Sequence, residues 1–346
     1  MDRKNFLSSV IPLTASFTAI AKGQPGTGKN PAESEEKIIK IPFYLKPGDT
    51  IGITCPSGYI SPEDILPAVN KIKEWGFESC VGDTVGAKDF TFAGSDEQRA
   101  KDFQNMMDDP SIKAIMLGRG GYGAVRIIDK IDFKKFSLKP KWIIGFSDAT
   151  VFHSHLNKNY GIASIHSKMC NSFPSDWSNA EPKQIDSIES IRKCLAGEKM
   201  DYTAVSNDNN HPGIAEGILI GGNLSILQNL AATKSDINTD GKILFLEEVE
   251  EYLYSIDRML WNLKRSGKLN KLEGLVLGGF NKIKPDDPGE EFGKTVYEIV
   301  LEKVSEYAYP VCFDFPVGHQ KENYALKCGV KHKLTVSDNS VTLKEI

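Results

Sequence analysis

Residues 142–159 read WIIGFSDATVFHSHLNKN, and this stretch decides the fold class. The apolar run 142–144 predicts a short buried strand, and residues 149–159 have the spacing of a helix. Between them, GFSD at 145–148 is a tight turn of the kind that joins a buried strand to the helix that covers it. The stretch therefore predicts one β-α unit of an α/β fold.

The same alternation continues on both sides of this unit. Strand-like and helix-like runs follow one another through the first half of the chain: strands at 49–55 and 113–117, and helices at 62–75, 97–107 and 124–131. Strands that alternate with helices favour a largely parallel sheet with both faces covered. In such a sheet, functional groups lie on loops at the carboxyl ends of the strands.

A turn-rich break, SNDNNHPG at 206–213, predicts a domain boundary. Beyond it, further elements are expected: strands at 217–220, 242–246 and 275–278, helices at 223–232, 255–266 and 293–305, and antiparallel strands within 331–344. Asn223 suits the N-cap of the first of these helices. We therefore expect an N-terminal domain at 46–205 and a C-terminal domain at 213–346.

The composition excludes several classes of protein. The chain has 346 residues, with 42 Lys and Arg against 46 Asp and Glu, so its formal net charge is −4. Without an excess of basic residues, a nucleic-acid partner is not expected. The six cysteines form no C-x-x-C pair, so neither a zinc site nor a disulfide scaffold is expected. They are interpreted as mostly buried, small apolar residues.

The first 21 residues predict a cleaved signal peptide. Arg3 and Lys4 precede a mostly apolar stretch at 6–20 that closes on an Ala-Ile-Ala match to a signal-peptidase site at 19–21. Residues 22–45 are interpreted as a linker. Its segment 23–30 nearly matches a phosphate-binding loop, but Asn30 replaces the required hydroxyl residue. The signal predicts export, to the periplasm or outside the cell, and the alternative is a cytoplasmic protein. No later apolar run is long enough for a membrane span, so no stable membrane insertion is expected after the signal is removed.

Ser147 is the strongest candidate for a catalytic residue. A serine on a strand-to-helix turn projects its hydroxyl above the sheet, and the next backbone N–H points to where an oxyanion would form. Ala149 replaces the last glycine of the G-x-S-x-G pattern and is small enough for the helix to approach the strand. The alternative interpretation is that Ser147 or Asp148 is an ordinary helix N-cap.

A glycine-rich turn, GRGGYG at 118–123, follows the expected strand at 113–117. It matches the dinucleotide pattern G-x-G-x-x-G, but no acidic residue lies about 20 positions later, where the ribose needs one. The glycines could instead expose backbone N–H groups that complete an oxyanion hole beside Ser147. They could also serve only a tight turn that needs positive φ.

Two further features could complete a catalytic site. Four glutamates between 247 and 251 follow the expected strand at 242–246, and one of them could orient a histidine, although most such clusters are solvated loops. These residues alone do not select among the four. His319 follows a Pro/Gly turn and is the most suggestive histidine, because the turn places it on a loop at a strand end. The other five histidines are expected to be structural or exposed.

Five motifs occur in one order along the chain: RGGYG at 119–123, GFSD at 145–148, GGNL at 221–224, LE at 246–247 with IDRML at 256–260, and GH at 318–319. Together they resemble the serine LD-carboxypeptidase family, the muramoyl-tetrapeptide carboxypeptidases, which have the microcin-immunity peptidases as relatives. The similarity covers about residues 46–335.

The resemblance implies a triad with Ser147 as nucleophile, Glu247 as the orienting carboxylate and His319 as general base and acid. It also implies a flavodoxin-like parallel-sheet N-terminal domain, a smaller β-rich α/β C-terminal domain, and an active site in the cleft between them. The expected reaction removes the terminal D-alanine from peptidoglycan tetrapeptides. The resemblance implies no metal or organic cofactor. It also implies that the protein forms a homodimer.

The remaining site residues also follow from the resemblance. The oxyanion hole corresponds to the backbone N–H groups of Gly120 or Gly121 and of Asp148. A free terminal carboxylate on the substrate requires a cation or backbone donors, and Arg119 is a candidate by residue type. Tyr122, in the same turn, is a second candidate for binding the substrate.

The chain departs from the family pattern in two places. Residues 166–168 read His-Ser-Lys where relatives commonly have His-Gly-Pro, and Glu248 stands where relatives often have aspartate.

Two other functions stay open. One is a peptidase of the same chemistry that acts on aminoacyl-nucleotide or other small amide toxins, and the other is a ligand-binding module without catalysis.

Overall fold

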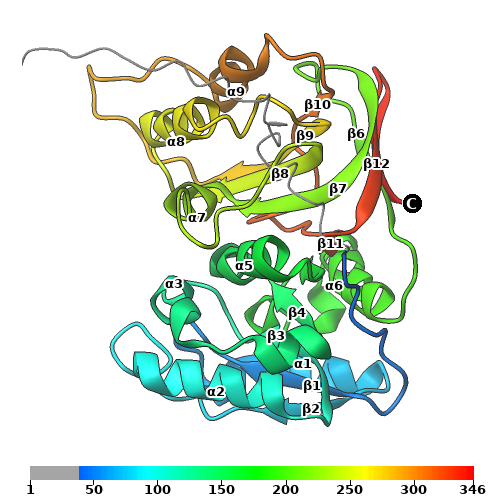
Figure 1. The fold of residues 1–346 in the computed structure, drawn as a ribbon. Coiled ribbons are helices and arrows are strands. Elements are labelled where there is room, and N and C mark those ends of the chain that lie inside the picture. Colours follow the sequence, from blue (N-terminus) through cyan, green and yellow to red (C-terminus); the bar gives the residue numbers. More distant parts are fainter. Residues whose placement is uncertain (1–38) are drawn as a thin grey trace, which may run out of the picture. The chain divides into compact units, whose positions relative to one another are not determined.

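The computed structural model describes residues 39–346, which form two β-sheets and their helices (Figure 1). The predicted signal peptide, 1–21, and residues 22–38 of the predicted linker lie outside the described residues. Among the helices described, none is both long and apolar enough to cross a membrane.

The first sheet has six strands in the order β11-β5-β4-β3-β1-β2. All neighbouring pairs are parallel except β11 with β5. The order 2-1-3-4-5 of its first five strands is that of flavodoxin-like sheets. The strands are β1 (Thr50–Thr54), β2 (Glu78–Val81), β3 (Ile112–Leu117), β4 (Trp142–Gly145), β5 (Ser164–His166) and β11 (Leu326–Cys328).

Helices with clear end signals accompany this sheet. Ser61 caps one helix, and Ser95 forms a capping box with Gln98 at the start of the next, so their free N–H groups find partners. The helices are α1 (Pro62–Glu74), α2 (Asp96–Asp108), α3 (Ala124–Ile127), α4 (Lys134–Leu138), α5 (Thr150–Tyr160) and α6 (Pro182–Leu195). Short 3₁₀ turns lie at Ile128–Lys130, Ser147–Ala149, Cys170–Ser172 and Trp177–Asn179.

The second sheet has seven strands in the order β10-β9-β8-β7-β12-β13-β6. Strands β7 to β10 pair with one another in parallel, whereas the pairs β7 with β12, β12 with β13 and β13 with β6 are antiparallel. The strands are β6 (Asp201–Val205), β7 (Gly213–Asn223), β8 (Lys242–Val249), β9 (Gly274–Asn281), β10 (Val311–Cys312), β12 (Lys331–Val336) and β13 (Ser340–Glu345). Its helices are α7 (Leu224–Asn229), α8 (Leu253–Arg265) and α9 (Val296–Val304).

The predicted fold class, α/β with a parallel-strand sheet and a second sheet, is confirmed. Asn223 is the N-cap of α7 as predicted, since its side chain accepts from the N–H of Ile226 at 3.2 Å. Two strands lie in unexpected places: β6, inside the expected N-terminal domain, joins the second sheet, and β11, from the C-terminal part, joins the first. The division into 46–205 and 213–346 stays a prediction.

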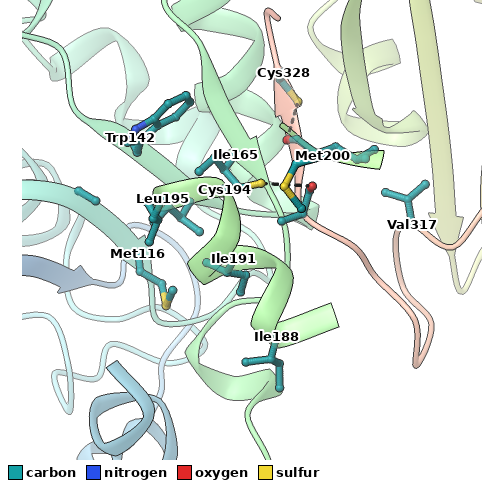
Figure 2. Close-up of a cluster of buried hydrophobic side chains, with 14 of the residues drawn as sticks. Met116, Trp142, Ile165, Ile188, Ile191, Cys194, Leu195, Met200, Val317 and Cys328 are labelled. Atoms are coloured by element: carbon teal, nitrogen blue, oxygen red, sulfur yellow. Dashed lines mark hydrogen bonds between the residues drawn. The ribbon is translucent and has the colours of Figure 1, made fainter. Parts of the chain in front are cut away.

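A buried apolar cluster draws side chains from both sheets, among them Trp142 of β4 in the first and Phe245 of β8 in the second. Figure 2 shows part of this cluster, with Trp142 and Cys328 of the first sheet labelled. Cys194 of α6 is also in this cluster. All six cysteines are free thiols and five are buried, as the interpretation of the sequence expects. The β-α unit that carries Ser147 lies between the sheets, because α5 packs against both β5 and β7.

Candidate active site

Ser147 lies in a strained turn between β4 and α5. Its φ is +61°, in the left-handed region that residues other than glycine rarely adopt. Phe146 before it is extended, with φ −142° and ψ −173°, so the chain reverses sharply at Ser147. Strain of this kind costs about 1–3 kcal/mol and is concentrated at functional sites. The backbone thus has the shape of a nucleophile elbow.

Small residues allow the strand and the helix to approach each other at this turn. A Cβ atom on Gly145 would lie 3.0 Å from the Cβ of Ala149, which is closer than most such contacts. Ala149 is fully buried. Alanine therefore fits where the elbow pattern usually has a second glycine.

Asp148 connects this turn to the neighbouring loops through its side chain. Its buried carboxylate accepts hydrogen bonds from the hydroxyl of Ser57 and from the backbone N–H of Ala124, the latter at 2.8 Å. Burial raises the pKa of this carboxyl, and the two hydrogen bonds partly oppose the shift. The side chain of Asp148 positions the turn, so only its backbone N–H is left as a candidate oxyanion donor.

The glycine-rich turn lies directly against Ser147. A Cβ atom on Gly120 would lie 3.0 Å from the Cβ of Ser147 and 3.1 Å from its hydroxyl oxygen. Gly121 has φ +102°, which also requires glycine. Among residues 39–346, no hydrogen bond is found from the backbone N–H of either glycine. Gly120 therefore borders Ser147, and the N–H groups of both glycines stay candidates for the predicted oxyanion hole.

A buried arginine shapes the far end of this turn. Arg99 of α2 is fully buried and donates to the carbonyl oxygens of Pro56 and Gly123. A Cβ atom on Gly123 would lie 2.5 Å from its guanidinium nitrogen, so only glycine fits there. The last glycine of the dinucleotide-like pattern thus has a packing role.

Glu247 and His319 form a hydrogen-bonded pair. Nδ1 of His319 lies 2.6 Å from Oε2 of Glu247, and the backbone N–H of His319 donates to the same oxygen at 3.2 Å. The Glu247 side chain is fully buried, and that of His319 is 20% exposed. Gly318 allows this contact, because a Cβ atom there would lie 2.5 Å from the Cβ of Glu247.

A break in strand register singles out Glu247 from the acidic cluster. The pairing of β8 with β9 shifts between Leu246 and Glu248, and Glu247 lies at that irregularity. Such irregularities redirect side chains and are frequent beside active sites. Glu248 accepts from Asn223 and from the N–H of Ser225.

Opposing effects set the pKa of His319. Burial lowers it, whereas the hydrogen bond and the negative charge of Glu247 raise it, and the net shift is upward from the ordinary value of 6.5. Because the carboxylate lies on Nδ1, that nitrogen carries a proton and Nε2 is the basic atom of the neutral ring.

The GGN motif at 221–223 contacts the start of α5, the helix that follows Ser147. The hydroxyl of Thr150, the first residue of α5, accepts a hydrogen bond from the backbone N–H of Asn223 at 3.1 Å. A Cβ atom on Gly222 would lie 2.4 Å from that hydroxyl. This motif therefore links β7 of the second sheet to the turn that carries Ser147.

His319 lies close to the nucleophile turn. The rings of Phe146 and His319 have their centroids 4.8 Å apart, and Phe146 immediately precedes Ser147. Both rings line an open hollow of about 530 Å³. The structure thus brings His319 and the residue before Ser147 to one hollow, although they are far apart in the sequence, whereas Ser147 and Glu247 do not themselves line it.

Arg119 and Tyr122 lie away from this hollow. Arg119 is exposed, donates to the carbonyl of Tyr59 at 3.0 Å, and lines a second hollow with Glu63 and Asp64. Tyr122 is 53% exposed and lines neither hollow. One residue, Asn171, lines both hollows, so the two are neighbours.

Lys168 and Asn171 are lining residues that the sequence analysis did not assign. Both follow β5, a strand of only three residues, which is too short for a periodic pattern. The sequence feature that could have drawn attention to Lys168 is the departure from the family's His-Gly-Pro pattern at 166–168. Within residues 39–346, no cluster of three or more His, Cys, Asp or Glu side chains could hold a metal ion.

Comparison with known families assigns both halves of the chain. Residues 51–167 match the LD-carboxypeptidase N-terminal domain, and residues 216–334 match the LD-carboxypeptidase C-terminal domain. Together these matches cover more than half of the chain.

Individual relatives agree with the family match. The crystal structure of muramoyltetrapeptide carboxypeptidase from Oxalobacter formigenes is 30% identical, with a TM-score of 0.76 over 86% of this chain and 98% of its own. The murein tetrapeptide carboxypeptidase of Pseudomonas aeruginosa is 29% identical over 81% of this chain and 91% of its own length. The microcin C7 self-immunity protein of Escherichia coli is 24% identical over 87% and 94%, respectively.

Proposed function

Because the chain belongs to the LD-carboxypeptidase family, we propose that it removes the terminal D-alanine from peptidoglycan tetrapeptides through an acyl-enzyme on Ser147. The observation that carries this proposal is the Glu247–His319 pair beside the strained turn of Ser147. The names of two relatives, a murein tetrapeptide and a muramoyltetrapeptide carboxypeptidase, support the choice of substrate. A module without catalysis does not fit a family of carboxypeptidases.

The first half of the reaction forms the acyl-enzyme. Nε2 of His319 takes the proton of the Ser147 hydroxyl, and the serine oxygen attacks the carbonyl carbon of the bond to D-alanine. Backbone N–H groups of Gly120 or Gly121 and of Asp148 stabilise the oxyanion. The carbon–nitrogen bond then breaks, and the protonated His319 gives its proton to the leaving amine.

The second half releases the tripeptide. Neutral His319 takes a proton from water, the resulting hydroxide attacks the ester carbon, and the proton passes to Ser147 as the ester bond breaks. Throughout, Glu247 keeps the histidine ring oriented and stabilises its protonated form.

Arg119 and Tyr122 stay candidate substrate contacts in this proposal. Arg119, expected from its residue type to bind the terminal carboxylate, is placed instead on the acyl side of the peptide, and Tyr122, which lines neither hollow, stays a candidate as a residue of the same turn. Arg119 precedes Gly120, which borders Ser147, and its hollow adjoins the hollow of His319 through Asn171. This arrangement supports a substrate that extends across both hollows.

A second candidate substrate is a small amide toxin. The 24% identity with a microcin C7 self-immunity protein over 87% of this chain favours it. The chemistry would be the same, with an aminoacyl-nucleotide amide in place of the tetrapeptide.

The test incubates the purified protein with disaccharide tetrapeptide and, separately, with an aminoacyl sulfamoyl adenosine. Mass spectrometry follows D-alanine, the tripeptide and the free amino acid. We expect D-alanine from the wild type and none from Ser147→Ala, which should unfold at the same temperature within a few degrees. Release of the amino acid from the nucleotide alone would establish the second candidate, and no release from either compound would refute both.

Export through the signal peptide at 1–21, action in the periplasm and assembly as a homodimer complete the proposal. Cell fractionation with N-terminal sequencing of the mature chain tests export, and light scattering on the eluted protein tests the dimer. A full-length chain in the cytoplasm, or a mass of one chain, would contradict the respective part.

A further inference from the structure

Lys168 occupies the same level of the first sheet as the nucleophile. Strands β4 and β5 are parallel, with Gly145 paired to His166 and the N–H of Ser167 bonded to the carbonyl of Gly145 at 3.1 Å. Ser147 and Lys168 each follow the end of their strand by two residues. Neighbouring strands are about 4.8 Å apart, so Lys168 lies on the loop beside the nucleophile turn.

The Lys168 side chain is buried without a counter-ion. The residue is 6% exposed, and its ammonium contacts the carbonyl oxygen of Gln320 at 3.3 Å. Burial lowers its pKa to about 8, and no carboxylate within residues 39–346 opposes that shift. By contrast, the fully buried Lys303 and Lys327 pair with Asp257 and Glu345, respectively. A buried cation without a partner is costly, which indicates that an anion completes the site in use.

The hollow beside Lys168 suits an anion. Three lysines line it and no aspartate or glutamate does. Lys282 and Lys321 are exposed and already paired with Glu250 and Glu181. Lys168 is therefore the lining cation whose charge is not balanced by a carboxylate among the described residues.

His319 lines the same hollow, which identifies the part of the substrate that lies there. In the proposed reaction His319 protonates the leaving amine. In a terminal amino acid one Cα atom separates that nitrogen from the carboxylate, so the carboxylate oxygens lie about 3 Å from it. A cation that binds the terminal carboxylate must therefore border the hollow of His319, as Lys168 does and Arg119 does not.

We propose that the ammonium of Lys168 binds the terminal carboxylate of the substrate and makes the enzyme specific for a free carboxyl end. This inference rests on the proposed function and adds the residue that selects the leaving group. The ion pair forms only when substrate enters, and it offsets the burial of the charge.

The test compares two substrates that differ in one charge: the diaminopimelate tetrapeptide that ends in D-alanine, and the same peptide that ends in D-alaninamide. Initial rates give kcat and KM for the wild type, Lys168→Met, Lys168→Arg and Lys282→Met. Methionine keeps the length of the side chain and removes the charge. Lys282→Met is the matched control, because it removes an exposed, paired charge from the same hollow.

We expect Lys168→Met to lower kcat/KM for the acid by about 10- to 100-fold, mainly through KM, as loss of a charge-assisted contact implies. The rate on the amide should change little, so the preference for the acid disappears. Lys168→Arg should keep part of the preference for the acid, and Lys282→Met should keep that preference within about threefold of the wild type. Because Lys168→Met removes an unpaired buried charge, the variant should fold, and its unfolding temperature should be higher than that of the wild type.

The outcomes separate the two proposals. A wild type that cleaves the acid, with an acid-to-amide ratio unchanged in Lys168→Met, overturns the role of Lys168 and leaves the proposed function standing. A wild type that cleaves the acid and the amide equally also overturns the role of Lys168 and leaves the proposed function standing. A folded wild type that cleaves neither overturns the proposed function and this inference with it.

Discussion

At the scale of single residues, the Glu247–His319 hydrogen bond should set the pH dependence of the proposed reaction. The basic form of His319 is the neutral ring, and the net effect of its surroundings raises its pKa above 6.5. For the wild type, kcat/KM should therefore rise with pH through a midpoint above 6.5. Glu247→Gln leaves burial as the main influence on the ring, so the midpoint should move down.

The same substitution should lower kcat by about 10³- to 10⁴-fold, as loss of the orienting carboxylate does in serine triads. Rates from pH 5 to 9 for both proteins check the shift. Glu250→Gln, at an exposed glutamate of the same cluster, is the comparison: its charge makes a smaller contribution to the pKa of His319, so the midpoint should move down less than in Glu247→Gln. A profile of Glu247→Gln that coincides with the wild type would remove Glu247 from the site.

At the scale of elements, the loop after β10 depends on Gly318. This residue has φ +97°, and a Cβ atom there would lie 2.5 Å from the Cβ of Glu247. Gly318→Ala should therefore displace the Glu247–His319 pair and lower kcat/KM by about 100-fold or more. It should also lose about 1–3 kcal/mol of stability through backbone strain.

The control variant Gly48→Ala separates the effect of backbone strain from the effect of displacing the Glu247–His319 pair. Gly48 has φ +87°, but a Cβ atom there would meet nothing within 4 Å. The control should thus lose about 1–2 kcal/mol of stability and no activity. Urea unfolding and kcat/KM of both variants check this pair. Equal activity in the two variants would contradict the role given to Gly318.

At the scale of the whole molecule, β11 links the two sheets. It pairs with β5 in the first sheet, although its chain neighbours β10 and β12 belong to the second. Lys327 of β11 is fully buried and pairs at 2.9 Å with Glu345 of β13, which is also buried. This ion pair therefore connects a strand of one sheet to a strand of the other.

Lys327→Ala should lower the free energy of unfolding by about 3–5 kcal/mol, because it leaves a buried carboxylate without its partner. Lys331→Ala, which breaks the half-exposed pair with Glu216, should cost less than about 1 kcal/mol. Urea unfolding measures both changes. A loss in Lys327→Ala no larger than in Lys331→Ala would show that the buried pair does not hold the sheets together.

Local pattern was enough for most elements of the fold. The periodicity of 62–75 and 97–107 predicts α1 and α2, and the apolar runs at 113–117 and 142–144 predict β3 and β4, each within a residue or two. The elements that it missed include α6, a helix of 14 residues, and several short strands. β5 has three residues and β11 has three, and their pairing partners come from distant parts of the chain.

For the site, the motif order suggested Ser147, Glu247 and His319 as a triad, which stays a prediction until the variants are measured. What the sequence by itself determined is the β-α unit around Ser147 and the set of motifs. Only the tertiary structure decided that Glu247 and not Glu248 reaches His319, that Arg119 faces another hollow, and that Lys168 is buried beside the nucleophile turn. The physical reason is that a side chain's neighbours depend on strand register and on the packing of segments far apart in sequence, whereas periodicity and turn chemistry act within a few residues.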